Sequence, residues 1–242
     1  MRTSDRVLVI VPAWNEEESV GVTVSEVLRA DSSYDVVVID DGSTDATARV
    51  AAEAGATVLS LPFNLGVGGA MRTGFSWAER CGYSRAIQVD ADGQHNPGDI
   101  ARVLAGLESA DISIGARFAD VGDYSVSGPR RWAMVVLATV MSRVAKTKLT
   151  DVTSGFRAAN ARAIRQYVRY YPAEYLGDTI DSLVAACHSG LSVTQVGVAM
   201  RPRSAGRPSH SPVKAGVYLL RSVFALWLAI LRRPGTREAG LA

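Results

Sequence analysis

Hydrophobic and polar residues follow two alternating periods along the first half of the chain. Short apolar runs predict strands at 7–11, 36–39, 57–59, 85–89 and 111–114. Between these runs, apolar residues at helical spacing predict helices at 17–28, 44–54, 68–81 and 97–107. Strands that alternate with helices predict an α/β fold with a doubly wound, mostly parallel sheet flanked by helices.

Two aspartates, Asp90 and Asp92, follow the apolar strand predicted at 85–89. Open α/β sheets bind ligands at the carboxyl ends of their strands. Two carboxylates followed by the amide of Gln94 suit Mg²⁺ or Mn²⁺, with coordination positions left for phosphate oxygens. This segment therefore predicts a site for a metal ion and a diphosphate.

Polar loops also follow the first two predicted strands, and we expect them at the same sheet edge. The first loop contains Trp14, which can cover a flat ring, and the second contains acidic residues that can accept from a ribose hydroxyl or a base N–H. Ser43 or Thr44 is expected to cap the helix at 44–54. The glycine-rich segment 64–70 opens the next helix, where free backbone N–H groups could meet phosphate or sugar oxygens.

The composition predicts a globular protein. The chain has 242 residues, of which 48% are apolar, enough for one large domain with a sizeable core. Cys81 and Cys187 have no metal-binding spacing, so we expect no disulfide and a reducing cytoplasm. The polar residues 1–6 lead directly into a strand, which predicts no signal peptide.

Positive charge is concentrated toward the C-terminus. No Asp or Glu occurs from Ser182 to Arg237, a stretch that carries Arg201, Arg203, Arg207, Lys214, Arg221, Arg232, Arg233 and Arg237. Such a segment suggests an anionic partner, either a lipid surface or a phosphorylated substrate. It has no nucleic-acid reading motif and is rich in aliphatic residues, which argues against nucleic acid.

The basic segment also contains an amphipathic helix, predicted at 213–231. Arg221 interrupts its apolar residues, and Tyr218, Phe224 and Trp227 suit the headgroup region, so a helix lying at a membrane surface fits better than one spanning it. The alternative is that this helix packs on the domain or on a second copy of the chain. We therefore divide the chain into a domain at 1–212 and a basic helix and tail at 213–242.

The motifs at 40–45, 64–66 and 90–95 resemble those of the inverting family 2 glycosyltransferases, which have the GT-A fold. The later Thr-Ser-Gly-Phe-Arg at 153–157 resembles the dolichyl-phosphate mannose synthase-like branch, which includes polyprenyl-phosphate glycosyltransferases. The ordered combination is specific, although each motif alone is weak. The basic segment 203–212 departs from the usual ending of the family's active-site flap.

This resemblance implies a set of site residues. Metal ligands would be Asp90, Asp92 and Gln94. The donor nucleotide-sugar would lie against Pro12, Trp14, Asn15, Glu16, Asp40, Asp41, Asp90, Ala91 and Arg201. The acceptor phosphate would bind Arg117, Arg131 and Ser154, and the residues expected to act directly in catalysis are Asp92, Arg117 and Arg131.

The chemistry follows from these groups. A divalent cation would neutralise a departing nucleoside diphosphate, UDP or GDP. A polyprenyl phosphate acceptor is already anionic at neutral pH, so it needs arginine more than a general base. We therefore expect metal-dependent, inverting sugar transfer to a polyprenyl phosphate by a peripheral protein at the cytoplasmic face of a membrane.

Two alternatives remain. The acceptor could be a saccharide hydroxyl, with Glu174 or Asp178, before and within a helix predicted at 176–188, as general base. The chain could also be a nucleotide-binding relative without catalysis, although the joint presence of both aspartates, Gln94 and the arginines argues against that.

Overall fold

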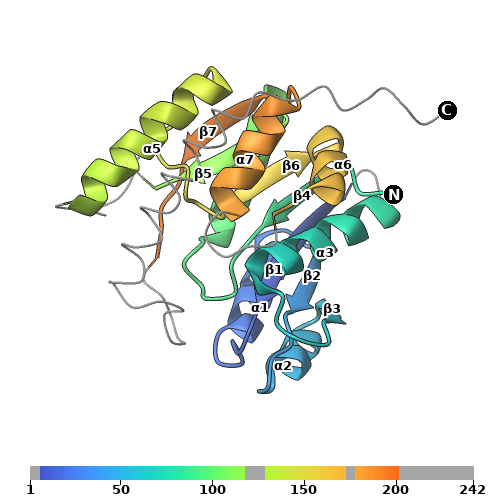
Figure 1. The fold of residues 1–242 in the computed structure, drawn as a ribbon. Coiled ribbons are helices and arrows are strands. Elements are labelled where there is room, and N and C mark those ends of the chain that lie inside the picture. The colour runs from blue at the N-terminus through green and yellow to red at the C-terminus, as the bar shows by residue number, and fades with distance from the viewer. Residues whose placement is uncertain (1–5, 118–128, 173–177, 202–242) are drawn as a thin grey trace.

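The strands form one twisted, mostly parallel sheet in the middle of the molecule (Figure 1). The computed structural model describes residues 6–117, 129–172 and 178–201. Within them the strand order is β3-β2-β1-β4-β6-β5-β7. The strands are β1 (Val7–Ala13), β2 (Tyr34–Asp40), β3 (Thr57–Ser60), β4 (Arg85–Gln88), β5 (Ile112–Ala116), β6 (Arg157–Asn160) and β7 (Val193–Gly197). The predicted α/β fold with a doubly wound sheet is confirmed.

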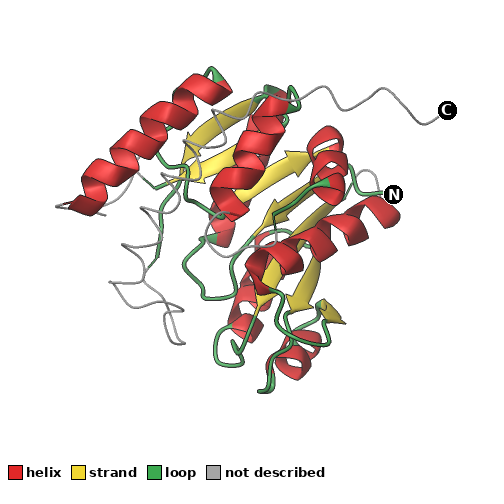
Figure 2. Cartoon of the chain, in the orientation of Figure 1, coloured by secondary structure: helices red, strands yellow, loops and turns green. Residues whose placement is uncertain are grey.

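Helices cover both faces of this sheet (Figure 2). The α-helices are α1 (Val20–Ala30), α2 (Thr47–Glu53), α3 (Gly66–Arg80), α4 (Ile100–Ala105), α5 (Pro129–Ala145), α6 (Ala161–Arg169) and α7 (Asp178–His188). Short 3-10 turns flank α4 as η2 (Pro97–Asp99) and η3 (Gly106–Glu108). The predicted helix at 97–107 is therefore three shorter pieces.

Successive residues of each central strand point to opposite faces, which separates the core into two layers. Leu8 and Ile10 pack with residues of α3, α5, α6 and α7. Val9 and Val11 pack with residues of α1, α2 and α4 on the other face. Because β1 is buried on both faces, its sequence is a continuous apolar run rather than an alternating one.

Two strands were not predicted from the sequence. Arg157–Asn160 forms β6, which runs antiparallel between β4 and β5. Val193–Gly197 forms β7, which pairs in parallel with β5. Both segments are short, and both carry polar side chains that mask an apolar pattern. Pairing with buried neighbours, rather than local propensity, makes them strands.

Ser43 and Thr44 do not cap α2, which begins at Thr47 without a side-chain cap. Instead they bond to the loop after β1. The Ser43 hydroxyl accepts from the backbone N–H of Asn15 at 2.9 Å. The backbone N–H of Thr44 donates to the side-chain oxygen of Asn15 at 2.8 Å. These two residues therefore tie together the loops that follow β1 and β2.

No helix within the described ranges is both long enough and apolar enough to cross a membrane. The predicted helix at 213–231, and the whole of 213–242, lie outside the described residues.

Candidate active site

Five segments carrying predicted site residues meet at one edge of the sheet. The carboxyl ends of β1, β2, β4 and β5 lie at this edge because these strands are parallel. Because β6 is antiparallel, its amino end, together with the turn before it, reaches the same edge. The topology therefore brings together loops that are more than a hundred residues apart in sequence.

The loop after β4 carries the predicted metal ligands. Gly93 has a φ of 75°, which allows the chain to reverse direction there. The Asp92 carboxylate accepts from the backbone N–H of Gln94 at 3.0 Å, and Asp92 is only 7% exposed. The Asp90 side chain is 37% exposed. The loop thus presents one open and one largely buried carboxylate beside Gln94.

These residues fit a divalent cation that shares its coordination with a ligand. Within the described part of the chain, no group of three His, Cys, Asp or Glu side chains could hold a metal ion. Two carboxylates and an amide leave several coordination positions to fill, and Mg²⁺ in proteins often completes its shell with substrate phosphates and water. Asp90, Asp92 and Gln94 thus offer the oxygen ligands that such a cation takes.

Asp90 is also flanked by two residues, Gln88 and Gly155, that were not predicted as part of the site. The side-chain amide of Gln88 donates to one oxygen of Asp90 at 2.8 Å. A Cβ on Gly155 would lie 3.3 and 3.4 Å from the two Asp90 oxygens, so only hydrogen fits there comfortably. Gln88 is the last residue of β4 and lies two residues before Asp90, and the alternation of side chains along an extended segment, which could have identified Gln88, puts both on one face.

The loops after β1 and β2 are cross-linked by polar contacts. Asn15 has a positive φ of 54°, and Trp14 beside it is 45% exposed. The Glu16 amide donates to the Thr47 hydroxyl at 2.8 Å. The Asp40 carboxylate accepts from the Ser43 amide at 3.0 Å. The exposed ring of Trp14 is thus carried by a well-bonded loop.

Three further residues predicted to bind the nucleotide-sugar have defined neighbours in the fold. Pro12 is half-buried within β1, opposite Ile39. The Glu16 carboxylate accepts from the Ser19 hydroxyl at 2.6 Å. Ala91 is 3% exposed, and its carbonyl accepts from the Thr23 hydroxyl at 3.0 Å.

Asp41 bonds to the glycine-rich loop. Its carboxylate accepts from the Leu65 amide at 2.7 Å, and the Gly66 amide donates to Asn64 at 2.9 Å. The backbone N–H groups of Leu65 and Gly66, which were expected to be free for a ligand, therefore form hydrogen bonds within the protein. Burial raises the pKa of Asp41 above its usual value, with a smaller contribution from the charge of Asp40, although the loop amides oppose the shift.

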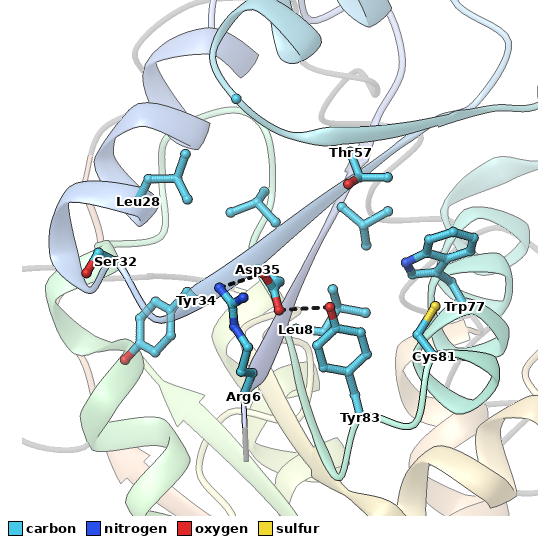
Figure 3. A pocket seen from close by; sticks show the side chains of 13 residues that line it. Arg6, Leu8, Leu28, Ser32, Tyr34, Asp35, Thr57, Trp77, Cys81 and Tyr83 are labelled. Atoms are coloured by element: carbon cyan, nitrogen blue, oxygen red, sulfur yellow. Dashed lines mark hydrogen bonds and ion pairs between the residues drawn. The ribbon is translucent and has the colours of Figure 1, made fainter. Parts of the chain in front are cut away.

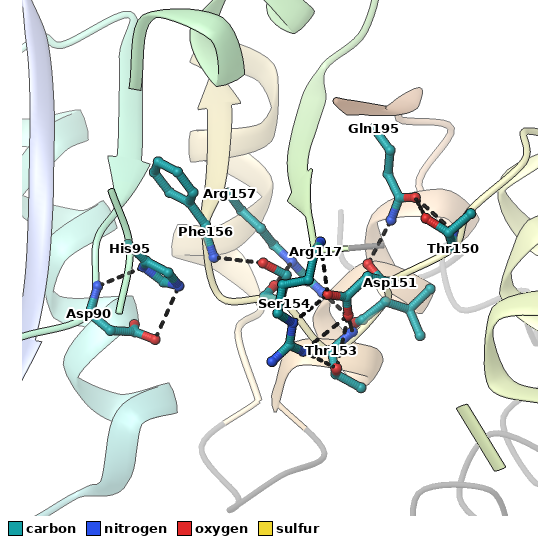
Figure 4. A network of polar contacts seen from close by, with 11 residues as sticks. Asp90, His95, Arg117, Thr150, Asp151, Thr153, Ser154, Phe156, Arg157 and Gln195 are labelled. Atoms are coloured by element: carbon teal, nitrogen blue, oxygen red, sulfur yellow. Dashed lines mark hydrogen bonds and ion pairs between the residues drawn. The ribbon is translucent and has the colours of Figure 1, made fainter. Parts of the chain in front are cut away.

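Arg117 lies directly after β5 and pairs with a carboxylate that was not predicted (Figure 4). Its Nε and Nη2 donate to the two oxygens of Asp151 at 2.6 and 3.2 Å, and Nη2 also donates to the Thr153 hydroxyl at 2.8 Å. The side chain of Asp151 is fully buried. Burial alone would raise the pKa of Asp151, but the bonds and charge of Arg117 outweigh it and lower that pKa.

Gln195 of β7 holds the backbone of Thr150 and Asp151 in place. Its side-chain nitrogen donates to the Asp151 carbonyl at 2.6 Å, and its oxygen accepts from the Thr150 amide at 2.7 Å. Sequence reasoning missed this contact because Gln195 belongs to a strand without an apolar signature.

Arg157 anchors the turn that carries Ser154. Its guanidinium donates to the carbonyls of Ser154, Val152 and Thr179 at 2.8, 2.6 and 2.7 Å. Ser154 itself is 3% exposed. Arg157 therefore acts inside the protein, where it joins the turn to α7.

Of the remaining predicted residues, Arg201 lies within the described part of the chain with its side chain. Arg201 is exposed and bonds to Glu26 and Asn96, each at 2.7 Å. Arg131 belongs to the first turn of α5, but its side chain lies outside the described residues. The same holds for Glu174 and the side chain of Asp178. Their predicted contacts stay predictions.

A pocket of about 270 Å³ lies at the opposite edge of the sheet, by the amino ends of β1 and β2 (Figure 3). Its two charged side chains and the Tyr83 phenol are joined in one cluster. Asp35 accepts from Arg6 at 2.7 Å and from the Tyr83 hydroxyl at 2.8 Å. The predicted site residues are all elsewhere, so this pocket is not the candidate active site.

Comparisons with known proteins agree with this fold. Polyprenol monophosphomannose synthase of Mycolicibacterium smegmatis is 31% identical, over 85% of this chain and 81% of its own length. Undecaprenyl-phosphate mannosyltransferase of Micrococcus luteus is 31% identical, over 85% and 88%. The crystal structure of glucosyl-3-phosphoglycerate synthase from Mycobacterium tuberculosis with Mn²⁺, UDP and glucosyl-3-phosphoglycerate has a TM-score of 0.69 at 18% identity, covering 95% of this chain and 81% of that one.

The sequence profile described as Glycosyl transferase family 2 matches residues 8–168, which span β1 to α6. With this match, with relatives above 30% identity over most of their length, and with a fold shared with solved GT-A enzymes, the chain belongs to glycosyl transferase family 2 and is a glycosyltransferase.

Proposed function

We propose that this glycosyltransferase moves a sugar from a nucleoside-diphosphate donor to a polyprenyl phosphate, in a metal-dependent reaction that inverts the anomeric centre. One observation carries the proposal. The turn 153–156 has Asp90 against Gly155 on one side and Arg117 bonded to Thr153 on the other. The carboxylate proposed to bind the cation and the guanidinium proposed to bind phosphate thus lie on either side of one short turn.

On the donor side, Asp90, Asp92 and Gln94 would hold Mg²⁺ or Mn²⁺. When bound there, the cation would neutralise charge on the departing nucleoside diphosphate. Trp14 and the Asn15–Ser43 contact would border the nucleoside, because they stand at the neighbouring strand ends. A structure with the same fold was solved with Mn²⁺ and UDP, which supports a metal ion and a nucleoside-diphosphate donor for this chain.

On the acceptor side, Arg117 would bind the lipid phosphate. Asp151 and Thr153 fix the plane of its guanidinium, and a fixed guanidinium binds phosphate through directional hydrogen bonds. Arg131 would add a second positive charge. A phosphate oxygen is anionic at neutral pH, so the attack requires no general base.

The bond changes balance without another reactant. An acceptor phosphate oxygen forms a bond to the anomeric carbon from the face opposite the leaving group. The bond from that carbon to the donor phosphate breaks, and its electron pair leaves with the nucleoside diphosphate. The products are a polyprenyl-phosphate sugar of inverted configuration and UDP or GDP.

The relatives support the acceptor class. Two of them, at 31% identity, are named for mannosyl transfer to polyprenol or undecaprenyl phosphate. A lipid acceptor requires the enzyme to work at a membrane surface. We propose a peripheral protein at the cytoplasmic face, with the basic segment 213–242 contacting anionic lipid.

The test is a transfer assay with labelled GDP-mannose, UDP-glucose and UDP-N-acetylglucosamine. Each donor is incubated with the full chain, a short polyprenyl phosphate and Mn²⁺. We expect label in the organic phase with one donor, inverted anomeric configuration by NMR, and loss of product with EDTA. Label found only in water-soluble saccharide would instead support transfer to a hydroxyl group.

A chelated enzyme that kept full activity would contradict the metal assignment while leaving the acceptor assignment standing. Binding of nucleoside diphosphate without any turnover on all donors and acceptors would favour the non-catalytic alternative. Partitioning of the full chain onto anionic and neutral vesicles tests the surface location separately.

A further inference from the structure

His95 closes the loop that carries the proposed metal ligands. Its Nδ1 accepts from the backbone amide of Asp90 at 3.0 Å. The preceding residue, Val89, still donates to the Ile10 carbonyl of β1 at 3.0 Å. The Asp90 amide points away from β1, because successive backbone amides of an extended segment face opposite edges, and the imidazole accepts it there.

This contact also decides where the imidazole carries its hydrogen. A nitrogen that accepts a hydrogen bond has no hydrogen of its own, so a neutral ring must carry it on Nε2. Nε2 lies 3.6 Å from Oδ2 of Asp90. The imidazole thus contacts Asp90 through both nitrogens. Nδ1 accepts from the Asp90 backbone N–H, and the Nε2–H group lies beside the Asp90 carboxylate.

The two oxygens of Asp90 are consequently flanked by different partners. Gln88 donates to Oδ1 at 2.8 Å, whereas the His95 N–H lies beside Oδ2. Because the Asp90 side chain is 37% exposed, part of the carboxylate remains open toward solvent. A cation approaching from that side would meet a carboxylate whose rotation is restricted.

The imidazole is itself fixed. Its side chain is 2% exposed and stacks on Phe156, with ring centroids 4.8 Å apart and planes 14° apart. Phe156 belongs to the turn that contacts Arg117 (Figure 4). The backbone of His95 forms an antiparallel bridge with Met200, and the Arg201 amide donates to the Gln94 carbonyl at 2.9 Å.

From this geometry we propose that His95 is a positioning residue, which holds Asp90 in the orientation that binds the donor's metal ion. The inference rests on the proposed function, since it assigns Asp90 to the metal. It adds a role for a buried histidine that touches neither substrate nor metal. Carboxylate ligands commonly depend on such hydrogen-bonded neighbours, whose loss lowers metal affinity by about 10–100-fold.

Two variants separate positioning from simple packing. His95→Phe keeps the ring that stacks on Phe156 but removes both nitrogens. His95→Asn removes the ring but keeps an acceptor near the position of Nδ1. Affinity for Mn²⁺, alone and with GDP or UDP, is measured by electron paramagnetic resonance, and folding is checked by circular dichroism and thermal unfolding.

We expect His95→Phe to lower Mn²⁺ affinity at least about tenfold, and His95→Asn to lower it less. If packing is the only role, the order reverses, because the Phe variant then keeps wild-type affinity. The matched control is His188→Phe at the exposed end of α7, which should leave Mn²⁺ affinity unchanged.

A second measurement needs neither metal nor a variant. Nitrogen-15 NMR of labelled wild-type protein should show His95 with a bare Nδ1 and a protonated Nε2, and the opposite tautomer would overturn the inference. A wild-type protein without affinity for Mn²⁺ would refute the proposed metal dependence. The NMR result would still decide whether His95 fixes Asp90.

Discussion

Arg117 and Asp151 form a two-point ion pair in which the Asp151 side chain is fully buried and the Arg117 side chain is 21% exposed. The distances are 2.6 Å from Nε to Oδ2 and 3.2 Å from Nη2 to Oδ1. The pair joins the end of β5 to the turn before β6. The charge of Arg117 is therefore held near the site by a group that solvent does not reach.

Asp151→Ala should destabilise the protein strongly. The substitution leaves a partly buried guanidinium without its carboxylate, and breaking a buried ion pair from one side costs about 3–5 kcal/mol. The free energy of unfolding is measured by urea denaturation at neutral pH.

The matched control is the exposed pair Arg49–Glu53 of α2, whose side chains are 65% and 62% exposed. Glu53→Ala should cost about 0.5 kcal/mol or less, because exposed pairs one helical turn apart contribute little. Equal losses for the two variants would show that the Arg117–Asp151 pair contributes no more than a surface contact.

Asp41→Asn should change the pH dependence of stability in a definite direction. Burial raises the pKa of Asp41 in the folded protein. The folded state therefore binds the proton more tightly than the unfolded chain does. This contribution is fully present below the unfolded pKa of about 3.9 and is lost as pH rises through the raised pKa.

Asparagine keeps an oxygen for the Leu65 amide but never ionises. We therefore expect the stability of the variant relative to wild type to rise between pH 3 and pH 7. Urea denaturation of both proteins at the two pH values measures it. A relative stability that falls over the same interval would contradict the raised pKa.

The sequence predicted the parts of this fold that depend on local pattern. The apolar run around Val9 and the placement of Asp90 beyond a strand end were both confirmed. The strand at 157–160 was not predicted, because the residues Arg-Ala-Ala-Asn become a strand only through pairing with β4 and β5.

The same reason explains which site residues were missed. Asp151, Gln195 and His95 act through partners that lie 34, 44 and 5 residues away, respectively, and the first two contacts need the whole sheet in place. Motifs identified the residues expected to face a ligand. They did not identify Asp151 and Gln195, which act through contacts across the sheet. His95 lies within the motif at 90–95, but the motif did not show its contact with Asp90.

Asp92→Asn should remove most turnover without unfolding the loop. In the wild type the Asp92 carboxylate accepts from the backbone N–H of Gln94 at 3.0 Å. The asparagine oxygen can still accept this bond, but the negative charge is lost. We expect turnover to fall at least about 100-fold, the scale seen when one electrostatic group is removed from an active site. We also expect Mn²⁺ to stop enhancing the thermal shift produced by nucleoside diphosphate.

Asp31→Asn, between α1 and β2 at the far edge of the sheet, is the control for loss of one carboxylate. It should keep both turnover and the Mn²⁺-dependent shift. An Asp92→Asn enzyme as active as this control would rule out a metal role for Asp92.

Gly155→Ala should weaken metal binding through contact with Asp90. The added Cβ would lie 2.8 Å from the Gln88 side-chain nitrogen and 3.3 and 3.4 Å from the Asp90 oxygens. The first distance is too short, so Gln88 must move and its bond to Asp90 must lengthen. We expect Mn²⁺ affinity to fall about tenfold, measured by electron paramagnetic resonance.

Gly98→Ala provides the comparison, because a Cβ there meets only ordinary contacts, at 3.5 Å or more from Asn96. That variant should bind Mn²⁺ as the wild type does. If Gly155→Ala also binds normally, the Gln88–Asp90 contact does not control the metal site. If it binds less well at unchanged thermal stability, the turn before β6 sets the position of the Asp90 carboxylate that follows β4.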